Sequence, residues 1–494
     1  MTNAPEEAAK QPPAEQPAIT AEPADDLVTT RHSITIDGTE LHYTVTAGRV
    51  VLRLEGHTDD KFDGPKPKAE VFVTAYTADA EDPVARPVTF AFNGGPGSSS
   101  VWLHLGLLGP RRVVLESDGN LPKPPFRLTD NQYSLLDQTD LVFIDPVSTG
   151  YSRPVEGEKA KEWHGFKKDI ASVGDFIRLY TTRYNRWLSP KFLAGESYGT
   201  TRASGLSGYL QERHGLYLNG IMLVSAVLNF STIEFHIGND LPFILFLPAY
   251  AATAWYHQKL KGRKPLQTLL KEVEKFAFGE YADALMKGRE LTRQKRRQIV
   301  EKLTRYTGLS AEFIERTDLR VTDQHFFKEL LRERGETVGR LDSRFVGRDR
   351  LGVTDTPEYD PLLTNVLGPY TAAFYDYIRT ELKFESDLSY EILSEFVNPW
   401  SYANAENRYI NVSETLRAAM TYNPHLRVFV ASGYYDLGTP YSATEYTFNH
   451  LGLHESLRGN ISMSYYEAGH MMYIHVPSLE RLKADLAGFM RSAM

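Results

Sequence analysis

Gly195-Glu196-Ser197-Tyr198-Gly199 is the motif from which the fold of this chain can be predicted. Residues 191–194 before it, apolar from Phe192 on, predict a β-strand, and helical periodicity begins at Tyr198. A serine between small residues at a strand-to-helix turn is typical of a nucleophile elbow, which exposes the hydroxyl for attack on a carbonyl group. The alternative is a glycine-bounded turn whose serine only caps the helix. The strand before it and the helix after it favour the nucleophile.

Apolar runs alternate with helical stretches on both sides of this turn. The runs that predict strands are residues 88–92, 141–144, 192–194, 221–224, 428–430 and 461–466. Helical periodicity fills residues 166–184 and 198–213, and an amphipathic helix is expected from residue 478 to about the last residue. This alternation is typical of a mostly parallel sheet covered by helices.

The N-terminal part has a different pattern. A hairpin is predicted around Asp37-Gly38, and residues 69–76 alternate between apolar and polar side chains. With the elbow, these features predict an α/β-hydrolase fold: a mostly parallel central sheet with N-terminal antiparallel strands and an inserted helical cap. Ser197 then lies at the carboxyl end of a central strand.

Four segments follow from the changes in pattern. Residues 1–26 are rich in Ala, Pro and Glu and lack the aromatic residues of a core, so we expect a disordered tail. Residues 27–228 form the first part of the α/β-hydrolase core. Residues 229–400, in which the strand signal fades, form the inserted helical cap. Residues 401–494 form the second part of the core.

Composition excludes several classes of protein. The chain has no cysteine, which rules out disulfides and thiolate nucleophiles, and its formal net charge of −8 argues against a nucleic-acid partner. The apolar residues 241–250 are too few to cross a membrane. The sequence contains neither a His-Glu-x-x-His zinc motif nor a phosphate-binding loop, and we expect no metal and no cofactor.

The compartment and the oligomeric state are less constrained. The N-terminus lacks the basic and apolar regions of a signal peptide, which suggests a cytoplasmic protein as written. Removal of a signal sequence would instead make it periplasmic or secreted. The sequence does not indicate an oligomeric state.

An acid and a histidine are expected to complete the site, in that order along the chain. Asp436 is the first carboxylate after the strand at 428–430; its alternative role is to cap the following helix. His470 follows the last predicted strand and is favoured over His450 and His475. His470 would take the proton of Ser197 and return it to the leaving group, while Asp436 would orient the imidazole.

The tetrahedral intermediate of such a reaction needs backbone N–H donors. One is expected from Tyr198, directly after the nucleophile. The other is expected from the run that follows the strand at 88–92, Asn93-Gly94-Gly95-Pro96-Gly97-Ser98-Ser99-Ser100, whose glycines allow the backbone to approach a ligand closely. The alternative for this run is a tight turn without a catalytic role.

Three motifs together resemble those of the serine carboxypeptidases, in particular the carboxypeptidase Y-like members. They are the Asn93 to Ser100 run, the elbow around Ser197, and Gly469-His470-Met471. A fourth block, residues 145–152, is similar to another block of that family. The absence of cysteine suggests a bacterial-type member.

The resemblance implies removal of C-terminal residues from peptides with a free C-terminus. It implies that the amides of Gly95 and Tyr198 bind the oxyanion. Asn93, Gly94 and Glu196 would bind the substrate, with Asn93 and Glu196 hydrogen-bonding its terminal carboxylate. Met471 would line the pocket for the leaving residue.

A carboxyl group beside a substrate carboxylate requires a shared proton. We therefore expect peptide hydrolysis to be best at acidic pH, where Glu196 is protonated. The chain departs from the family pattern at three points. Ala91 and Phe92 stand where a tryptophan is usual, Ser98 replaces a cysteine, and Leu107 occupies the place of a second glutamate. Arg153 and Arg202 are candidates for a substitute cation.

Two alternatives remain open from the sequence. An esterase or acyltransferase on the same scaffold would use the same acyl-enzyme on Ser197. A non-catalytic binding protein is the other alternative, against which the complete set of Ser197, Asp436 and His470 argues.

Overall fold

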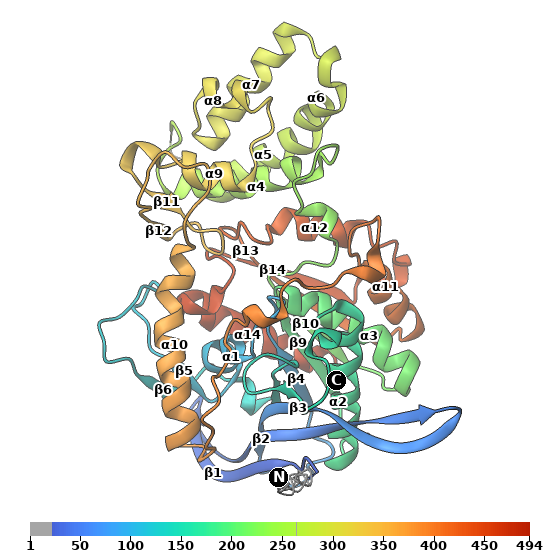
Figure 1. Ribbon diagram of the computed structural model, residues 1–494. Helices are drawn as coiled ribbons and strands as arrows, with labels where there is room; N and C mark the ends of the chain where they lie inside the picture. Colours follow the sequence, from blue (N-terminus) through green and yellow to red (C-terminus); the bar gives the residue numbers. More distant parts are fainter. Residues whose placement is uncertain (1–21, 263) are drawn as a thin grey trace, which may run out of the picture.

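The computed structural model describes residues 22–262 and 264–494. Among these residues a ten-stranded sheet forms the centre of the molecule (Figure 1). The strand order is β1-β2-β3-β7-β4-β9-β10-β13-β14, and β8 pairs with β3. The bounds are β1 Asp26–Ile36, β2 Thr39–Thr58, β3 Lys61–Ala78, β4 Val88–Phe92, β7 Asp140–Ile144, β8 Arg153–Pro154, β9 Lys191–Glu196, β10 Gly220–Val224, β13 Arg427–Gly433 and β14 Ile461–Tyr466.

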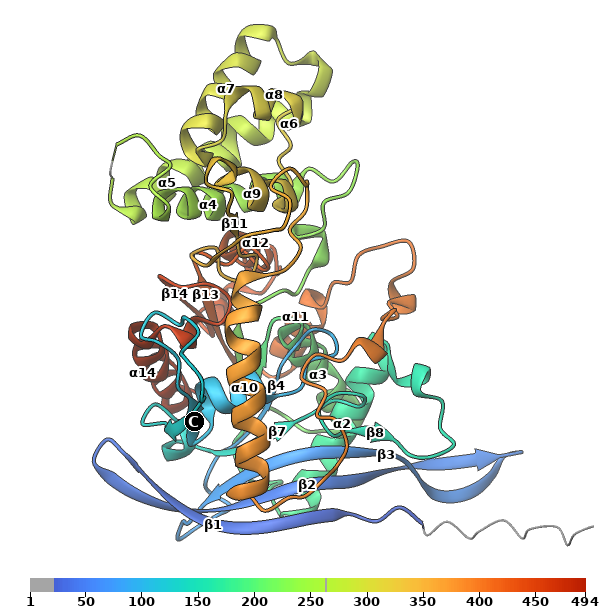
Figure 2. The ribbon, with the colours of Figure 1, turned by 60° about the vertical axis from the view of Figure 1, so that its left-hand side comes forward.

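The sheet has an antiparallel and a parallel part. Strands β1, β2, β3 and β7 pair antiparallel, whereas all pairs from β7 to β14 are parallel. The predicted hairpin turn is present: Asp37 and Gly38 have φ angles of 49° and 79°, as a two-residue hairpin loop requires. Strands β2 and β3 extend beyond the other strands as a long ribbon (Figure 2). Because β7 to β14 are parallel, their carboxyl ends meet at one edge of the sheet.

Two layers of helices cover the sheet. Three helices pack their side chains on one face of the sheet: α2 (Phe166–Arg183), α3 (Tyr198–His214) and α11 (Ser413–Tyr422). Three other helices pack on the opposite face: α1 (Val101–Leu103), α10 (Pro361–Thr380) and α14 (Val476–Ser492). Strand β9 shows the alternation, since Leu193 joins the first layer while Phe192 and Ala194 join the second. Both faces are therefore apolar, as expected for a buried parallel sheet.

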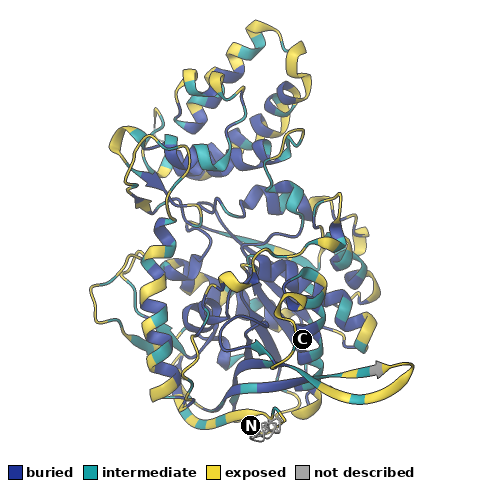
Figure 3. Cartoon of the chain, viewed as in Figure 1, coloured by how far each residue is buried: buried dark blue, intermediate teal, exposed yellow. Residues whose placement is uncertain are grey.

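A helical cap with its own buried core stands above the carboxyl edge of the sheet (Figures 1 and 3). Its helices are α4 Leu241–Tyr256, α5 Leu266–Phe276, α6 Ala282–Lys287, α7 Arg293–Thr307, α8 Ala311–Arg316 and α9 Asp323–Glu329. The short strands β11 (Thr337–Val338) and β12 (Val346–Gly347) follow. Helix α10 also lies within the predicted insertion, but its side chains belong to the core of the sheet domain. The limits of the insertion, 229–400, stay a prediction.

The remaining elements lie at the periphery. Strands β5 (Arg111–Val113) and β6 (Leu128–Asp130) form a small separate sheet, and α12 (Tyr441–Asn449) and α13 (Glu455–Arg458) connect β13 to β14. Within the described ranges, no helix is long and apolar enough to cross a membrane. In the same ranges, no group of three or more His, Asp or Glu side chains is arranged to hold a metal ion.

Residues 22–26, the last part of the predicted disordered tail, lie within the described part of the chain. Residues 1–21 lie outside the described part of the chain. Asp25 accepts a hydrogen bond from the backbone N–H of Val51 at 2.8 Å, and Asp26 already begins β1. The low apolar content of the tail did not predict the bond between Asp25 and Val51, because that bond joins a carboxylate to a backbone amide.

Candidate active site

Ser197 lies at the sharp turn between β9 and α3. Its backbone has φ 60° and ψ −130°, a conformation that is strained for a residue with a side chain, and its N–H donates to Val224 O at 3.0 Å. A Cβ on Gly195 would lie 2.2 Å from the carbonyl oxygen of Gly199, so the turn needs a glycine at that place. These features match the predicted nucleophile elbow.

His470 and Asp436 are hydrogen-bonded to each other. His470 Nδ1 lies 2.7 Å from Asp436 Oδ2. The other carboxylate oxygen, Asp436 Oδ1, accepts from the backbone N–H groups of Gly438 at 2.8 Å and Thr439 at 2.9 Å. Both side chains are buried, at 4% and 0% exposure. The acid is thus fixed from behind by the backbone and presents one oxygen to the imidazole.

The charges of this pair stabilise each other. Burial alone would raise the pKa of Asp436, but the charge of His470 and the hydrogen bonds outweigh it and lower that pKa. Burial would lower the pKa of His470, but the charge of Asp436 and its hydrogen bond outweigh it and raise that pKa above 6.5. The pair therefore favours the imidazolium that forms when the histidine accepts a proton.

Two hydrogen bonds connect the histidine loop to the elbow through Ser225 and Val224. Ser225 Oγ donates to His470 O at 2.7 Å, and its neighbour Val224 accepts from Ser197 N–H. The competing histidines have other partners: His450 bonds to the carbonyl of Tyr446, and His475 bonds to the hydroxyl of Ser478. Neither of these partners is a carboxylate, which supports the choice of His470.

The glycine run after β4 packs directly against the first residues of α3. A Cβ on Gly94 would lie 2.5 Å from the backbone nitrogen of Tyr198, and Gly95 has a φ of 99°, in the region that favours glycine. The carbonyl of Asn93 accepts a hydrogen bond from Arg202. The run that carries Gly95 and the amide of Tyr198, the two predicted oxyanion donors, is therefore held in contact with the elbow.

Glu196 is a buried acid next to the nucleophile. Its Oε2 accepts hydrogen bonds from Asn93 Nδ2 and from Tyr473 Oη, each at 2.8 Å. Burial raises the pKa of Glu196 to about 7, although the charge of His470 and the two hydrogen bonds act in the opposite direction. Glu196 therefore keeps its proton to a higher pH than an exposed glutamate does.

The comparison with known families supplies the identification. Residues 64–474 match the family described as serine carboxypeptidase. This chain belongs to the serine carboxypeptidase family. The match includes the elbow, the glycine run and the loops of Asp436 and His470.

Individual relatives within the serine carboxypeptidase group match over shorter lengths. The chain is 34% identical over 160 residues to the pheromone-processing carboxypeptidase KEX1 of Saccharomyces cerevisiae, which is 31% of this chain and 20% of that protein. It is 33% identical over 119 residues to the carboxypeptidase Y homolog A of Talaromyces stipitatus, which is 24% of this chain and 19% of that protein. The matched part thus spans about a fifth of the length of each relative.

A solved structure of a serine carboxypeptidase covers nearly the whole chain. The crystal structure of a prohormone-processing carboxypeptidase from Saccharomyces cerevisiae covers 91% of this chain and 91% of its own, with a TM-score of 0.54 and 16% identity. At this identity the similarity concerns the fold. It confirms the predicted α/β-hydrolase architecture.

The other residues predicted from the serine carboxypeptidase pattern have clear places. Arg202 is buried, with its Nε bonded to Asp169 at 2.9 Å, and Arg153 donates to the backbone carbonyls of Gly150, Ser152 and Ser389. Both arginines thus bond to other parts of the protein, and their role as a substitute cation stays a prediction. Met471 is buried directly after His470, and Leu107 is buried in the helical turn His104–Leu108.

A cap segment that the sequence did not reveal bonds to the loops of both Asp436 and His470. Leu341 O accepts from the N–H of His470 at 2.7 Å, and Asp342 Oδ2 accepts from the N–H of Gly469 at 2.9 Å. In the loop of Asp436, the N–H of Leu437 donates to the carbonyl oxygen of Arg340 at 2.9 Å. The cap is therefore tied by hydrogen bonds to the loops of His470 and Asp436.

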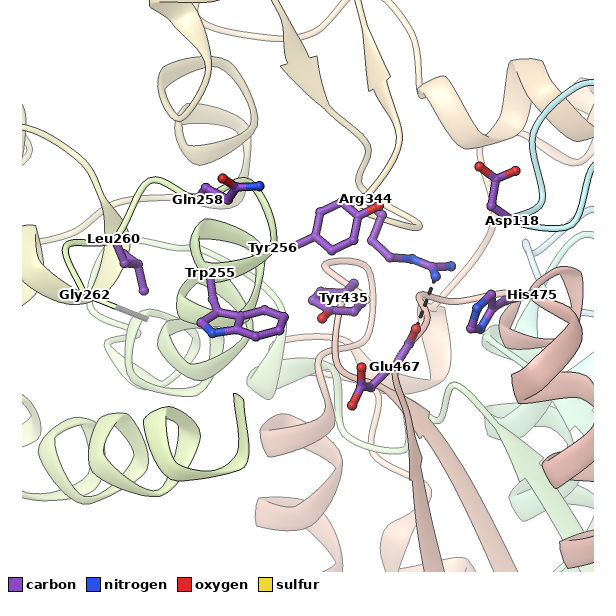
Figure 4. A pocket seen from close by; sticks show the side chains of 10 residues that line it. All are labelled: Asp118, Trp255, Tyr256, Gln258, Leu260, Gly262, Arg344, Tyr435, Glu467 and His475. Atoms are coloured by element: carbon purple, nitrogen blue, oxygen red, sulfur yellow. Dashed lines mark hydrogen bonds between the residues drawn. The ribbon is translucent and has the colours of Figure 1, made fainter. Parts of the chain in front are cut away.

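Arg344 belongs to the same cap segment, residues 340–344, and borders a cavity of about 630 Å³ (Figure 4). Its guanidinium pairs with Asp342 at 2.6 Å and also donates to the carbonyl of Glu467. Aromatic side chains from the cap and from the loop before Asp436 form much of the remaining wall: Trp255, Tyr256 and Tyr435. Ser197 and His470 are not among the residues that line this cavity.

We expect Asp342→Ala to lower the free energy of unfolding by about 3 kcal/mol, because it leaves the largely buried Arg344 without its partner. The backbone N–H of Gly469 also loses its acceptor. Urea unfolding followed by circular dichroism measures the change. Glu336→Ala is the matched control: its partner Arg348 is 76% exposed, so the change should stay within about 0.5 kcal/mol. Equal effects of the two substitutions would contradict the role given to Asp342.

Proposed function

We propose that this protein is a serine-type carboxypeptidase that removes C-terminal residues from peptides through an acyl-enzyme on Ser197. Family membership and the hydrogen-bonded pair of His470 and Asp436 support hydrolase chemistry. The observation that carries the choice of substrate is Glu196, a buried carboxyl beside the nucleophile with a pKa raised to about 7. In its protonated form it can donate a hydrogen bond to the free carboxylate of a peptide.

The mechanism follows from the roles assigned to these residues. His470 takes the proton of Ser197 as Oγ attacks the carbonyl carbon of the last peptide bond, and the amides of Gly95 and Tyr198 bind the oxyanion. The intermediate collapses, the C–N bond breaks, and His470 donates its proton to the departing amine. Water then attacks the acyl-enzyme with the same proton transfers, which frees the shortened peptide and Ser197.

Substrate recognition uses the neighbouring residues. Asn93 and Glu196 bind the terminal carboxylate, and Gly94 lets the backbone approach it closely. Met471, which is buried directly after His470, contacts the side chain of the leaving residue. The insertion at 229–400 stands over this site and shapes the pocket.

Mass-spectrometric digestion of a peptide library tests the proposal. We expect stepwise loss of single residues from free C-termini and much slower cleavage of the same peptides ending in an amide. Labelling of Ser197 by a fluorophosphonate checks the nucleophile independently. Ester hydrolysis without preference for a free carboxylate would favour the esterase or acyltransferase, and absence of labelling would favour a binding protein.

The pH dependence should differ between two kinds of substrate. Above a pH of about 7, where Glu196 loses its proton, we expect kcat/KM for free-acid peptides to fall about tenfold per pH unit. Blocked peptides or esters should not show this fall, because they present no carboxylate. On the acid side both kinds should lose activity as His470 takes up a proton, because the charge of Asp436 raises the pKa of that imidazole. Identical profiles for the two substrates would contradict the role of Glu196.

The bacterial type suggested by the sequence is supported only by the lack of cysteine. The relatives named above come from a yeast and a filamentous fungus and do not support it. It stays a proposal.

A further inference from the structure

The hydrogen bonds around Glu196 are one-sided. Both donors, Asn93 Nδ2 and Tyr473 Oη, bond to Oε2 at 2.8 Å. Within residues 22–262 and 264–494, no hydrogen bond joins Oε1 to another side chain or to the backbone. Oxygen Oε2 is therefore the acceptor in both protonation states, and the proton of the neutral acid belongs on Oε1.

Tyr473 can serve as a permanent donor in this arrangement. It lies in the helical turn Met472–Ile474, three residues after His470, and is 2% exposed. Burial and the charge of Glu196 raise its pKa well above the usual value of 10, so it stays neutral while Glu196 titrates. The carbonyl of Asn93 is fixed by Arg202 and its side-chain oxygen accepts from the N–H of Leu103, so the second donor is also held in place.

The ring of Tyr473 packs closely beside Gly106, next to Leu107. A Cβ on Gly106 would lie 2.5 Å from Tyr473 Cε2 and 2.5 Å from the hydroxyl of Tyr370, so the two rings fill the space beside the turn that carries Leu107. Leu107 itself is apolar and 1% exposed. The family pattern expects a second glutamate at Leu107, and here the partner of Glu196 comes instead from the loop that follows His470.

We propose that Tyr473 is a positioning residue for the terminal-carboxylate site: it replaces a second acid, holds Glu196 with Oε1 directed to the substrate, and leaves a single ionisation to govern binding of free-acid peptides. This inference rests on the function proposed above. The other titratable groups that act on Glu196 are His470 and Asp436, and Glu196 in turn acts on Tyr370. The same three groups remain when Tyr473 is changed.

The substitution Tyr473→Phe removes the hydroxyl and keeps the ring. A hydrogen bond to a carboxylate is stronger than one to a neutral acid, so its loss destabilises ionised Glu196 more than the protonated form. We expect the fall of kcat/KM for free-acid peptides to begin about one pH unit higher than in the unmodified protein. The profile for the same peptides ending in an amide or ester should not move at high pH.

Tyr377→Phe is a matched control, because it also removes a buried hydroxyl, one that bonds to Tyr76 at 3.0 Å. It should leave both profiles in place. The inference is overturned if Tyr473→Phe leaves the free-acid profile where it was, or shifts the free-acid and blocked profiles equally. If the unmodified protein does not prefer free-acid peptides at any pH, the proposed function fails instead.

A binding measurement keeps the inference testable if Tyr473→Phe does not fold. Calorimetric titration of the Ser197→Ala protein with a free-acid peptide gives Kd between pH 6 and 9. If Glu196 is the single group whose ionisation weakens binding, a plot of log Kd against pH should rise above a pH of about 7. Its limiting slope should be one. A slope approaching two would show a second acid in the site and overturn the inference.

Discussion

Replacing Ser197 with alanine should lower kcat by about 10⁶-fold, because no other group can form the acyl-enzyme. In the proposed mechanism the strained elbow presents this hydroxyl, and alanine fits the same backbone conformation no worse than serine does. Binding of free-acid peptides should persist, since the partners of the carboxylate, Asn93 and Glu196, are unchanged. Steady-state kinetics measure the loss, and calorimetry measures the retained binding.

Ser207→Ala is the matched control for this experiment. Ser207 lies in the same helix α3, is also buried, and bonds only locally to the carbonyl of Ser204. It should retain kcat within about threefold and still react with a fluorophosphonate. Residual activity above about one per cent in the Ser197→Ala protein would show that another residue is the nucleophile.

Replacing Asp436 with asparagine should lower kcat by about 10⁴-fold. The backbone N–H groups of Gly438 and Thr439 require an oxygen at the position of Oδ1, which places the amide NH₂ opposite His470 Nδ1. An NH₂ group cannot accept from Nδ1–H, so the imidazole adopts the other tautomer and its Nε2 carries a proton. It then cannot take the proton of Ser197.

The acid limb of the pH profile should also move in this variant. Asp436 raises the pKa of His470 in the unmodified protein, so its removal lowers that pKa and shifts the limb to lower pH. Asp175→Asn is the control, because Asp175 also bonds to a histidine, His214, at 3.0 Å, but lies on α2. It should leave kcat nearly unchanged. A loss below about tenfold in Asp436→Asn would argue that another carboxylate orients His470.

The sequence predicted the parts of the molecule that depend on local pattern. Strands such as β4 match the predicted residues 88–92, and the elbow could be placed because a strand precedes it and a helix follows it. Asp436 and His470 could be proposed because the fold orders the acid and the histidine along the chain after known strands. The structure then brought the two within hydrogen-bond distance.

Contacts between distant segments could not be predicted in this way. Asp342 and Gly469 are 127 residues apart, and Tyr473 and Glu196 are 277 residues apart. No periodicity marks Asp342 in the cap, and Tyr473 is one of 28 tyrosines. For the same reason, the helical pattern of α10 could not show that its side chains join the core rather than the cap.

Glu196 and His470 each influence the protonation of the other: the charge of His470 lowers the pKa of the acid, and the acid raises that of the imidazole. In the roles proposed here, turnover needs both groups neutral. That arrangement carries the same number of protons as an imidazolium beside a carboxylate, so pH cannot alter the ratio of the two tautomers. An arriving peptide carboxylate can, because it repels ionised Glu196. Binding of a free C-terminus would then favour transfer of the proton from the histidine to the acid, and so increase the share of the neutral imidazole that activates Ser197.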